Sequence, residues 1–198
     1  MFSVKRRLMS AIVFVNMGLA LAVSVKAQEV PIPILNPKFD MDVLTGAVYA
    51  SQVGITGWIA GPYSGVLRAS TTQYPSAPST GLYCAYLGGP PTSGSILQTL
   101  GATVQANTTY VLKMSVGARA DYVFTGYAAS LLAGNVVLAS GHKATPVGGT
   151  FVTEVVVYES GATPAQLGQP LQILITSTGD GEVDIQSVAL TALRTAQS

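Results

Sequence analysis

The sequence predicts an all-β protein, a single antiparallel β-sandwich that follows an N-terminal signal peptide. Two observations support this fold class. Apolar and polar residues alternate with a period of two in several short runs, as they do in half-buried strands. Gly, Pro and Asn gather between those runs, where they indicate turns. Many short strands separated by such turns are typical of sandwiches and barrels.

The first 27 residues are typical of a secretory signal peptide. A basic start, Lys5 to Arg7, precedes an apolar stretch over 8–25, and Val25-Lys26-Ala27 supplies a small-residue cleavage step. Cleavage after Ala27 leaves residues 28–198 as one β-sandwich domain. The alternative is an uncleaved anchor, but the apolar stretch is shorter than the roughly 20 residues that a spanning helix needs. We therefore expect a secreted protein, extracellular or periplasmic, with no membrane span in its mature form.

Composition excludes two classes of protein. Charged residues make up 10% of the 198 residues, against about 25% in average proteins. Lys5, Arg6, Arg7 and Lys26 precede every acidic residue, so the mature chain is mildly acidic and has no basic stripe for nucleic acid. A hydrophobic share of 48% excludes disorder. Cys84 is the single cysteine, so no intramolecular disulfide can form, and its apolar neighbours predict a buried, inert thiol.

The expected strands follow in order along the chain. Residues 43–92 are irregular and are expected to hold long loops with two or three short strands. Beyond them the alternating or apolar runs are 96–100, 110–117, 127–132, 136–140, 151–158, 171–176 and 184–193. Tyr110, Leu112, Met114 and Val116 form the set expected to face the core. Gly134-Asn135 is a hairpin turn, because both residues tolerate positive φ.

Catalytic motifs are scarce. The single histidine, His142, lies in an expected exposed turn, and no Gly-x-Ser-x-Gly elbow or zinc ligand set accompanies it. Paired carboxylates are the remaining enzymatic option. Glu154 and Glu159 are expected to face solvent, and Asp180 and Glu182 to lie in a turn. The other acidic candidates are Asp40, Asp42, Asp121 and Asp184. These positions lead to the prediction that the protein is not an enzyme.

Several motifs together resemble the galactose-binding-like jelly roll. The opening is Asn36-Pro37-Lys38-Phe39-Asp40 followed by Gly57-Trp58, and 96–100, 107–112 and 183–190 match later strands of the same plan. This fold is found in many carbohydrate-binding modules, and the order of motifs is similar to that of exported bacterial proteins with a PEP-CTERM tail, which this chain lacks. The resemblance covers about residues 32–193.

The resemblance implies a structural calcium ion (Ca²⁺) held by Asp40 and Asp184, which match the family's acidic positions. Oxygen ligands from two chain ends suit this ion. The alternative is that both are ordinary polar residues near strand ends. Trp58 is expected to pack under the fold rather than to stack on a sugar.

A sugar site would need aromatic faces beside hydrogen-bonding groups. Tyr63 and Tyr86, with Tyr74 and Tyr83, lie in the irregular third of the chain and form one candidate set. Arg119, Asp121 and Tyr122 form the other, although Arg119 and Asp121 could also be a surface ion pair of little energetic value.

We therefore predict a secreted, non-catalytic binding module that recognises carbohydrate through a sheet face or edge loops. Its partner would be a glycan or surface polymer. The alternative is a structural or assembly subunit of an envelope, extracellular matrix or larger complex. Few charges and many small side chains suit packing against a protein partner or another copy.

Overall fold

A computed structural model describes residues 29–45, 49–51, 54–77, 82–89 and 92–194. The predicted signal peptide lies outside these residues. The strands are β1 (Glu29–Ile32), β2 (Tyr49–Ser51), β3 (Ile59–Ala60), β4 (Ser64–Ala69), β5 (Leu82–Gly88), β6 (Ser95–Thr103), β7 (Thr108–Ala118), β8 (Tyr127–Ala133), β9 (Val136–Gly141), β10 (Thr150–Glu159), β11 (Pro170–Ser177) and β12 (Glu182–Arg194). The described residues include no helix.

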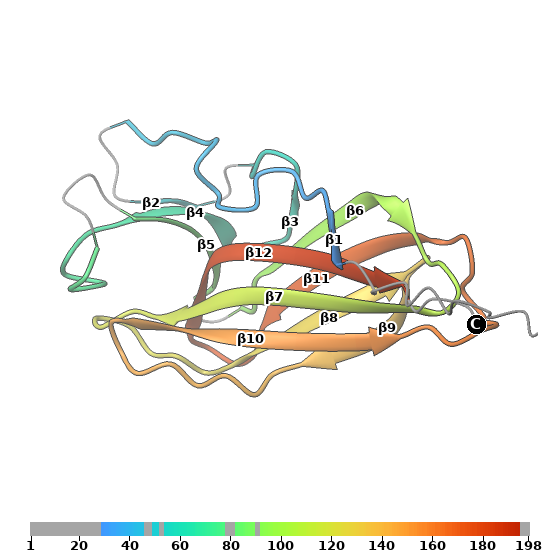
Figure 1. Ribbon diagram of the computed structural model, residues 1–198. Helices are drawn as coiled ribbons and strands as arrows, with labels where there is room; N and C mark the ends of the chain where they lie inside the picture. The colour runs from blue at the N-terminus through green and yellow to red at the C-terminus, as the bar shows by residue number, and fades with distance from the viewer. Residues whose placement is uncertain (1–28, 46–48, 52–53, 78–81, 90–91, 195–198) are drawn as a thin grey trace, which may run out of the picture.

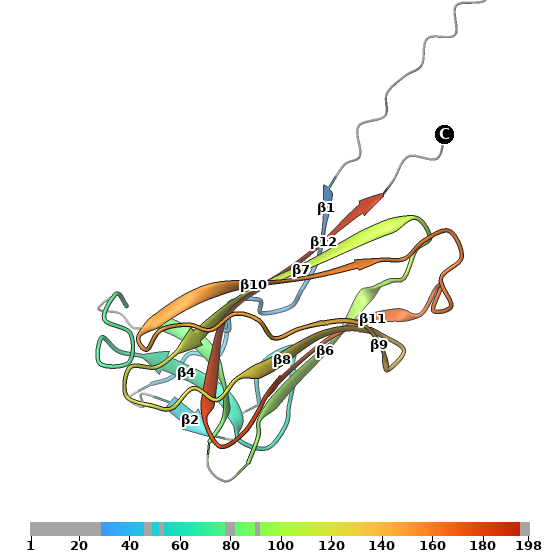
Figure 2. The same ribbon diagram turned by 90° about the horizontal axis from the view of Figure 1, so that it is seen from below.

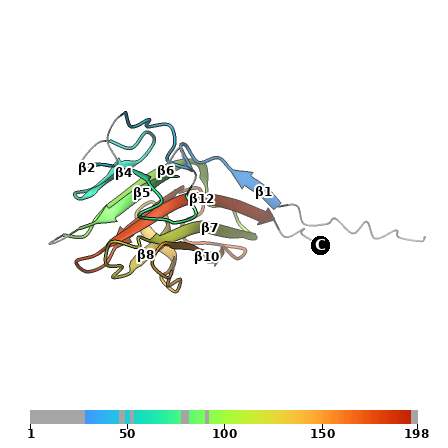
Figure 3. The ribbon, with the colours of Figure 1, turned by 90° about the vertical axis from the view of Figure 1, so that its left-hand side faces the viewer.

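Two antiparallel sheets face each other and form a sandwich, as the sequence predicts (Figures 1 and 2). The order of the larger sheet is β10-β7-β12-β5-β4-β2, and the order of the smaller is β3-β6-β11-β8-β9. Strand β12 is long enough to pair with β5 near its start and with β1 near its end. Strands β2 and β4, from the region predicted to be irregular, therefore lie at one end of the molecule and β1 at the other (Figure 3).

The alternation in β7 places its apolar set between the sheets, as expected. Tyr110, Leu112, Met114 and Val116 are all buried in the main core. The expected hairpin is also confirmed: Gly134 and Asn135 have φ of 54° and 69° between β8 and β9. Cys84 is buried, as the sequence predicts.

The opening motif holds the two sheets together. Phe39 packs against Trp58, with ring centroids 5.6 Å apart. The Gln98 amide on β6 donates to the carbonyls of Leu35 and Gly57, and the amide of Val188 on β12 donates to the Pro37 carbonyl. Trp58 is buried, as expected. The polar and aromatic groups of these residues make the contacts that join the opening motif to both sheets. Their role is therefore structural.

One strand has an orientation that the sequence analysis gets wrong. Glu154 on β10 faces inward and is buried, whereas we expected it to face solvent. Its carboxylate accepts hydrogen bonds from the Tyr127 hydroxyl and from the backbone amides of Lys143 and Ala144. Burial alone would raise the pKa of Glu154, but these donors stabilise the charged form and lower it.

No helix in the described part of the chain is long and apolar enough to cross a membrane.

Candidate active site

A second apolar cluster lies on the outer face of the larger sheet. Successive residues of a strand point to opposite faces, so Ala85 and Leu87 of β5 enter the main core while Cys84 and Tyr86 point outward. Leu67 of β4 joins this second cluster. An outward sheet face is normally solvated in an antiparallel sheet, so something must cover this one.

The cover is the segment 70–77, which follows β4. The Tyr74 amide donates to the Ser70 carbonyl, and the Gln73 carbonyl accepts from the amide of Ala120 just beyond β7. Tyr74 is fully buried, and its ring stacks on Phe151 of β10 with centroids 4.3 Å apart. The segment therefore holds one tyrosine side chain against the sheet.

Gly117 of β7 provides the room for these two rings. A Cβ atom at this position would lie 2.4 Å from the Phe151 ring and 2.6 Å from the Tyr74 hydroxyl. Both separations are shorter than real side-chain contacts, so any larger residue would push the rings away. Gly117 also lies opposite both Phe151 and Asp184 in the strand pairing.

Asp184 of β12 lies beneath Tyr74. Its side chain is 1% exposed, and the Tyr74 hydroxyl donates to its Oδ2 over 2.6 Å. Its Oδ1 is buried and has no hydrogen-bond partner among the described residues. Desolvation, and then the negative charge of Glu182, raise the pKa of Asp184 well above its ordinary value. This carboxyl group therefore keeps its proton at pH values where an exposed Asp has lost it.

Glu182, two residues before Asp184, lies in a network of charges at the edge of the cluster. Arg119 donates to Glu182 Oε1 over 2.9 Å and to both carboxylate oxygens of Asp121, each also over 2.9 Å. Burial raises the pKa of Glu182, although Arg119 opposes the rise, while the hydrogen bond from Arg119 lowers that of Asp121. The guanidinium of Arg119 also lies 5.4 Å from the centre of the Tyr122 ring.

The arrangement combines a neutral acid with aromatic walls. An acidic hydrogen on Oδ1 of Asp184 would have no acceptor within the described protein. Tyr74 would stabilise the carboxylate left after that hydrogen departs, because a donated hydrogen bond favours the charged form. Such a group can protonate an apolar, aromatic molecule in a site from which water is excluded.

The structure brings together most of the residues that the sequence singles out for ligand binding. Arg119, Asp121 and Tyr122 form one group, and Tyr86 lies opposite Asp184 in the strand pairing. Tyr63 is exposed in the turn before β4, and its carbonyl accepts from the Gly88 amide. That these residues bind a ligand stays a prediction.

The two residues of the predicted calcium pair have different surroundings. Asp40 is exposed, whereas Asp184 is buried and bonded to Tyr74. The opening segment meets β12 at Val188, four residues from Asp184, which is about 13 Å along a strand. The described residues include no group of three or more His, Cys, Asp or Glu that could hold a metal, and calcium at Asp40 and Asp184 stays a prediction.

One member of the site was predicted wrongly from the sequence, and the burial of another has no signal in it. Glu182 begins β12 and is buried, rather than lying in a turn. Asp184 alternates with the core residues Val183 and Ile185, so the pattern alone places it on the opposite, solvated face. Asp184 is buried because Tyr74 covers it. Tyr74 lies in the irregular region 43–92, where no alternating pattern indicates its position.

Comparisons with known proteins agree on one family. The family model described as HpiC1-like, HpiC1 cyclase, matches residues 30–191. A cyclase from Fischerella sp. TAU is 27% identical, with a TM-score of 0.75 over 86% of this chain and 100% of that one. The apo form of a cyclase from Fischerella sp. is 26% identical, with a TM-score of 0.74 over 85% of this chain and 98% of that one. No curated protein matches the sequence.

Two further matches were solved with bound small molecules. A Stig cyclase, Fisc, from Fischerella sp. TAU holds (3Z)-3-(1-methyl-2-pyrrolidinylidene)-3H-indole; it is 27% identical, with a TM-score of 0.74 over 85% of this chain and 100% of that one. A cyclase from Fischerella sp. TAU holds 4-(1H-indol-3-yl)butan-2-one; it is 27% identical, with a TM-score of 0.73 over 85% of this chain and 100% of that one. The ligands of these relatives are indole derivatives.

These matches correct the functional prediction made from the sequence. The assignment to carbohydrate-binding modules is wrong, and so are the non-catalytic role and the glycan or surface-polymer partner. The alternative of a structural or assembly subunit is also wrong. The physical reason is that the motifs behind the resemblance, around Phe39, Trp58 and Gln98, join the two sheets. Motifs of this kind report a sandwich and carry no information about its ligand.

Proposed function

This chain belongs to the HpiC1-like cyclase family, and from that premise we propose that it catalyses the acid-assisted cyclisation of a small indole-bearing molecule. The relatives from Fischerella that hold indole derivatives support the substrate class. The observation that carries the reaction type is the buried acid Asp184, with its raised pKa and its unpartnered Oδ1.

In this proposal Asp184 is the general acid. Its proton passes from Oδ1 to a carbon of the substrate, and a carbon–carbon bond then forms as the substrate's own π electrons fill the resulting cation. A proton lost from the cyclised cation restores the acid, so substrate and product are isomers. Tyr74 stays hydrogen-bonded to Oδ2 and stabilises the transient carboxylate.

The aromatic walls serve binding and charge stabilisation. The faces of Tyr74 and Phe151 suit a flat indole ring, and an electron-rich face also stabilises a cation above it. Because Asp184 is almost fully covered, the substrate reaches Oδ1 when the Phe151 ring swings aside, while Tyr74 keeps its hydrogen bond to Oδ2. The hydrogen bond from the Ala120 amide to the Gln73 carbonyl holds Tyr74 in place over Asp184.

Two measurements test the proposal. The purified protein is titrated with 4-(1H-indol-3-yl)butan-2-one, and saturable binding is expected that Phe151→Ala weakens. It is then incubated with a panel of 3-alkenylindoles, and liquid chromatography with mass spectrometry is used to look for products of unchanged mass. In D₂O the product should gain one carbon-bound deuterium, because the solvent-exchanged acid supplies the new hydrogen. After the indole N–H has exchanged back in water, this appears as a gain of one mass unit. Cyclised product without deuterium would contradict an acid-initiated reaction.

A further inference from the structure

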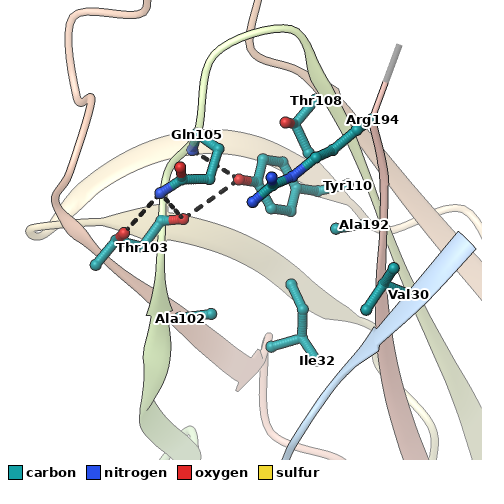
Figure 4. A pocket seen from close by; sticks show the side chains of 9 residues that line it. All are labelled: Val30, Ile32, Ala102, Thr103, Gln105, Thr108, Tyr110, Ala192 and Arg194. Carbon is teal, nitrogen blue, oxygen red and sulfur yellow. Dashed lines mark hydrogen bonds between the residues drawn. The ribbon is translucent and has the colours of Figure 1, made fainter. Parts of the chain in front are cut away.

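A cavity of about 310 Å³ lies at the end of the sandwich opposite to Asp184. It opens between β1, the end of β12, and the β6–β7 connection (Figure 4). Ala192, which lines it, is eight residues from Asp184 along β12, or about 26 Å in an extended strand. The cavity is therefore separate from the candidate active site.

The walls of this cavity are apolar, because strand alternation sends one face of each strand into it. Val30 of β1 pairs with Ala192 of β12, and both line the cavity together with Ile32. Ala102 of β6 lines it from the other sheet. The two alanines are small, so the space between the sheets is left unfilled here.

The polar groups at one side of the cavity are fixed in place. The Tyr110 hydroxyl accepts from the backbone amide of Gln105 over 2.8 Å and donates to the Thr103 carbonyl over 3.3 Å (Figure 4). The Gln105 side chain donates to the Thr103 hydroxyl over 2.9 Å. These groups satisfy one another, so they define the shape of the cavity without competing for a ligand.

Arg194 is the charged residue of the cavity lining, and Figure 4 shows its side chain reaching from the end of β12 toward Tyr110. In the described part of the chain no carboxylate forms an ion pair with it. The nearby Glu29 pairs with Leu193 and so lies on the other face of the strand pair. There its carboxylate accepts from the Thr191 hydroxyl. Among the described residues, Arg194 is thus a cation without a carboxylate partner at the edge of an apolar space.

We propose that this cavity binds a small amphipathic monocarboxylate, with the apolar body between the sheets and the carboxylate paired with Arg194. At about 30 Å³ for each water molecule of the liquid, the cavity has the volume of roughly ten water-sized heavy atoms. A medium-chain carboxylate such as octanoate has this size and charge. An Arg guanidinium offers a carboxylate two parallel hydrogen bonds, which distinguishes it from an alcohol or an amine.

Isothermal titration of the purified protein with octanoate tests the proposal, with octanol and octylamine as matched probes. Saturable octanoate binding is expected, octanol should bind more weakly, and octylamine should not bind. Arg194→Gln should weaken octanoate binding about tenfold or more and leave octanol unchanged, whereas Ala102→Phe should remove both by filling the space. If Ala102→Phe does not fold, Ala192→Leu fills the same cavity with a smaller change.

The Asp184→Asn variant separates this site from the proposed active site. It should bind octanoate as the unaltered protein does, whatever its effect on cyclisation. No saturable octanoate binding, or binding that Asp184→Asn removes and the cavity-filling variants leave intact, would overturn the proposal.

Discussion

Replacement of Asp184 by Asn is the most direct test of the proposed chemistry. Asn has the shape of a protonated Asp and still accepts the hydrogen bond that Tyr74 donates to Oδ2, but it cannot release a proton to substrate. General acid catalysis contributes about 10² to 10⁴ in rate. At about 1.4 kcal/mol for each factor of ten, the expected loss corresponds to about 3 to 5 kcal/mol of transition-state stabilisation.

The same variant has a predicted effect on stability. The raised pKa of Asp184 means that the folded protein binds this proton more tightly than the unfolded chain does. The free energy of unfolding is therefore highest below the ordinary carboxyl pKa and falls as the pH rises toward the raised value. Asp184→Asn removes the loss of unfolding free energy that comes from Asp184. The pKa of Glu182 is also raised by burial, so its separate contribution to the pH dependence of stability remains in the variant. At neutral pH the variant should be at least as stable as the unaltered protein.

The assay is the rate of isomer formation, measured beside thermal unfolding from pH 4 to 8. Asp180→Asn is the matched control, since Asp180 is exposed in the turn before β12, and it should change neither quantity. If Asp184→Asn retained activity within about twofold, Asp184 would not be the acid. If the unaltered protein showed the same pH dependence of stability as the variant, Asp184 would not be the buried proton carrier.

The contacts of Tyr74 and Arg119, the predicted calcium site and the predicted cleavage site give four more tests. Tyr74→Phe should destabilise the fold by about 1 to 3 kcal/mol in urea unfolding, because it leaves a buried acceptor unpaired. The same variant should slow turnover. Unchanged stability would show that the hydroxyl is dispensable. Arg119→Ala should lower the free energy of unfolding by about 3 to 5 kcal/mol, because Glu182 is left buried without its partner. Adding Glu182→Gln should restore much of this stability. If it does not, the destabilisation has another source. If calcium raises the melting temperature relative to EGTA, the rise should also be seen in Asp40→Asn. If the variant shows no such rise, Asp40 is a calcium ligand. If the leader is cleaved as predicted, N-terminal sequencing should find Gln28 first, and an intact leader would favour the membrane-anchor alternative.

Much of the sandwich could be predicted, because alternation is a local property. Each of the expected runs from 96–100 to 184–193 falls inside a strand, and the buried set on β7 is the one expected. The edge strand β10 was harder, since both of its faces carry valines. Glu154 is buried there by hydrogen bonds from Tyr127 and from a loop, which no pattern within β10 indicates.

The site itself was predictable only in part. The cluster of Arg119, Asp121 and Tyr122 is close in sequence, so its association could be anticipated from spacing. The wrong functional class came from motifs such as Phe39 and Trp58 that build the sandwich whatever it binds. The acid was identified as a candidate carboxylate, but its environment was not.

The sequence by itself determined the β-sandwich class and which residues of most strands face the core, because a period of two is fixed by the backbone. Only the tertiary structure decided that Asp184 is a buried acid. Its strand pattern points it outward, and its burial comes from Tyr74, 110 residues earlier, in a segment whose position depends on contacts with β7 and β10. A carboxyl group's proton affinity depends on the solvent around it, and that surrounding exists only once the distant parts of the chain have met.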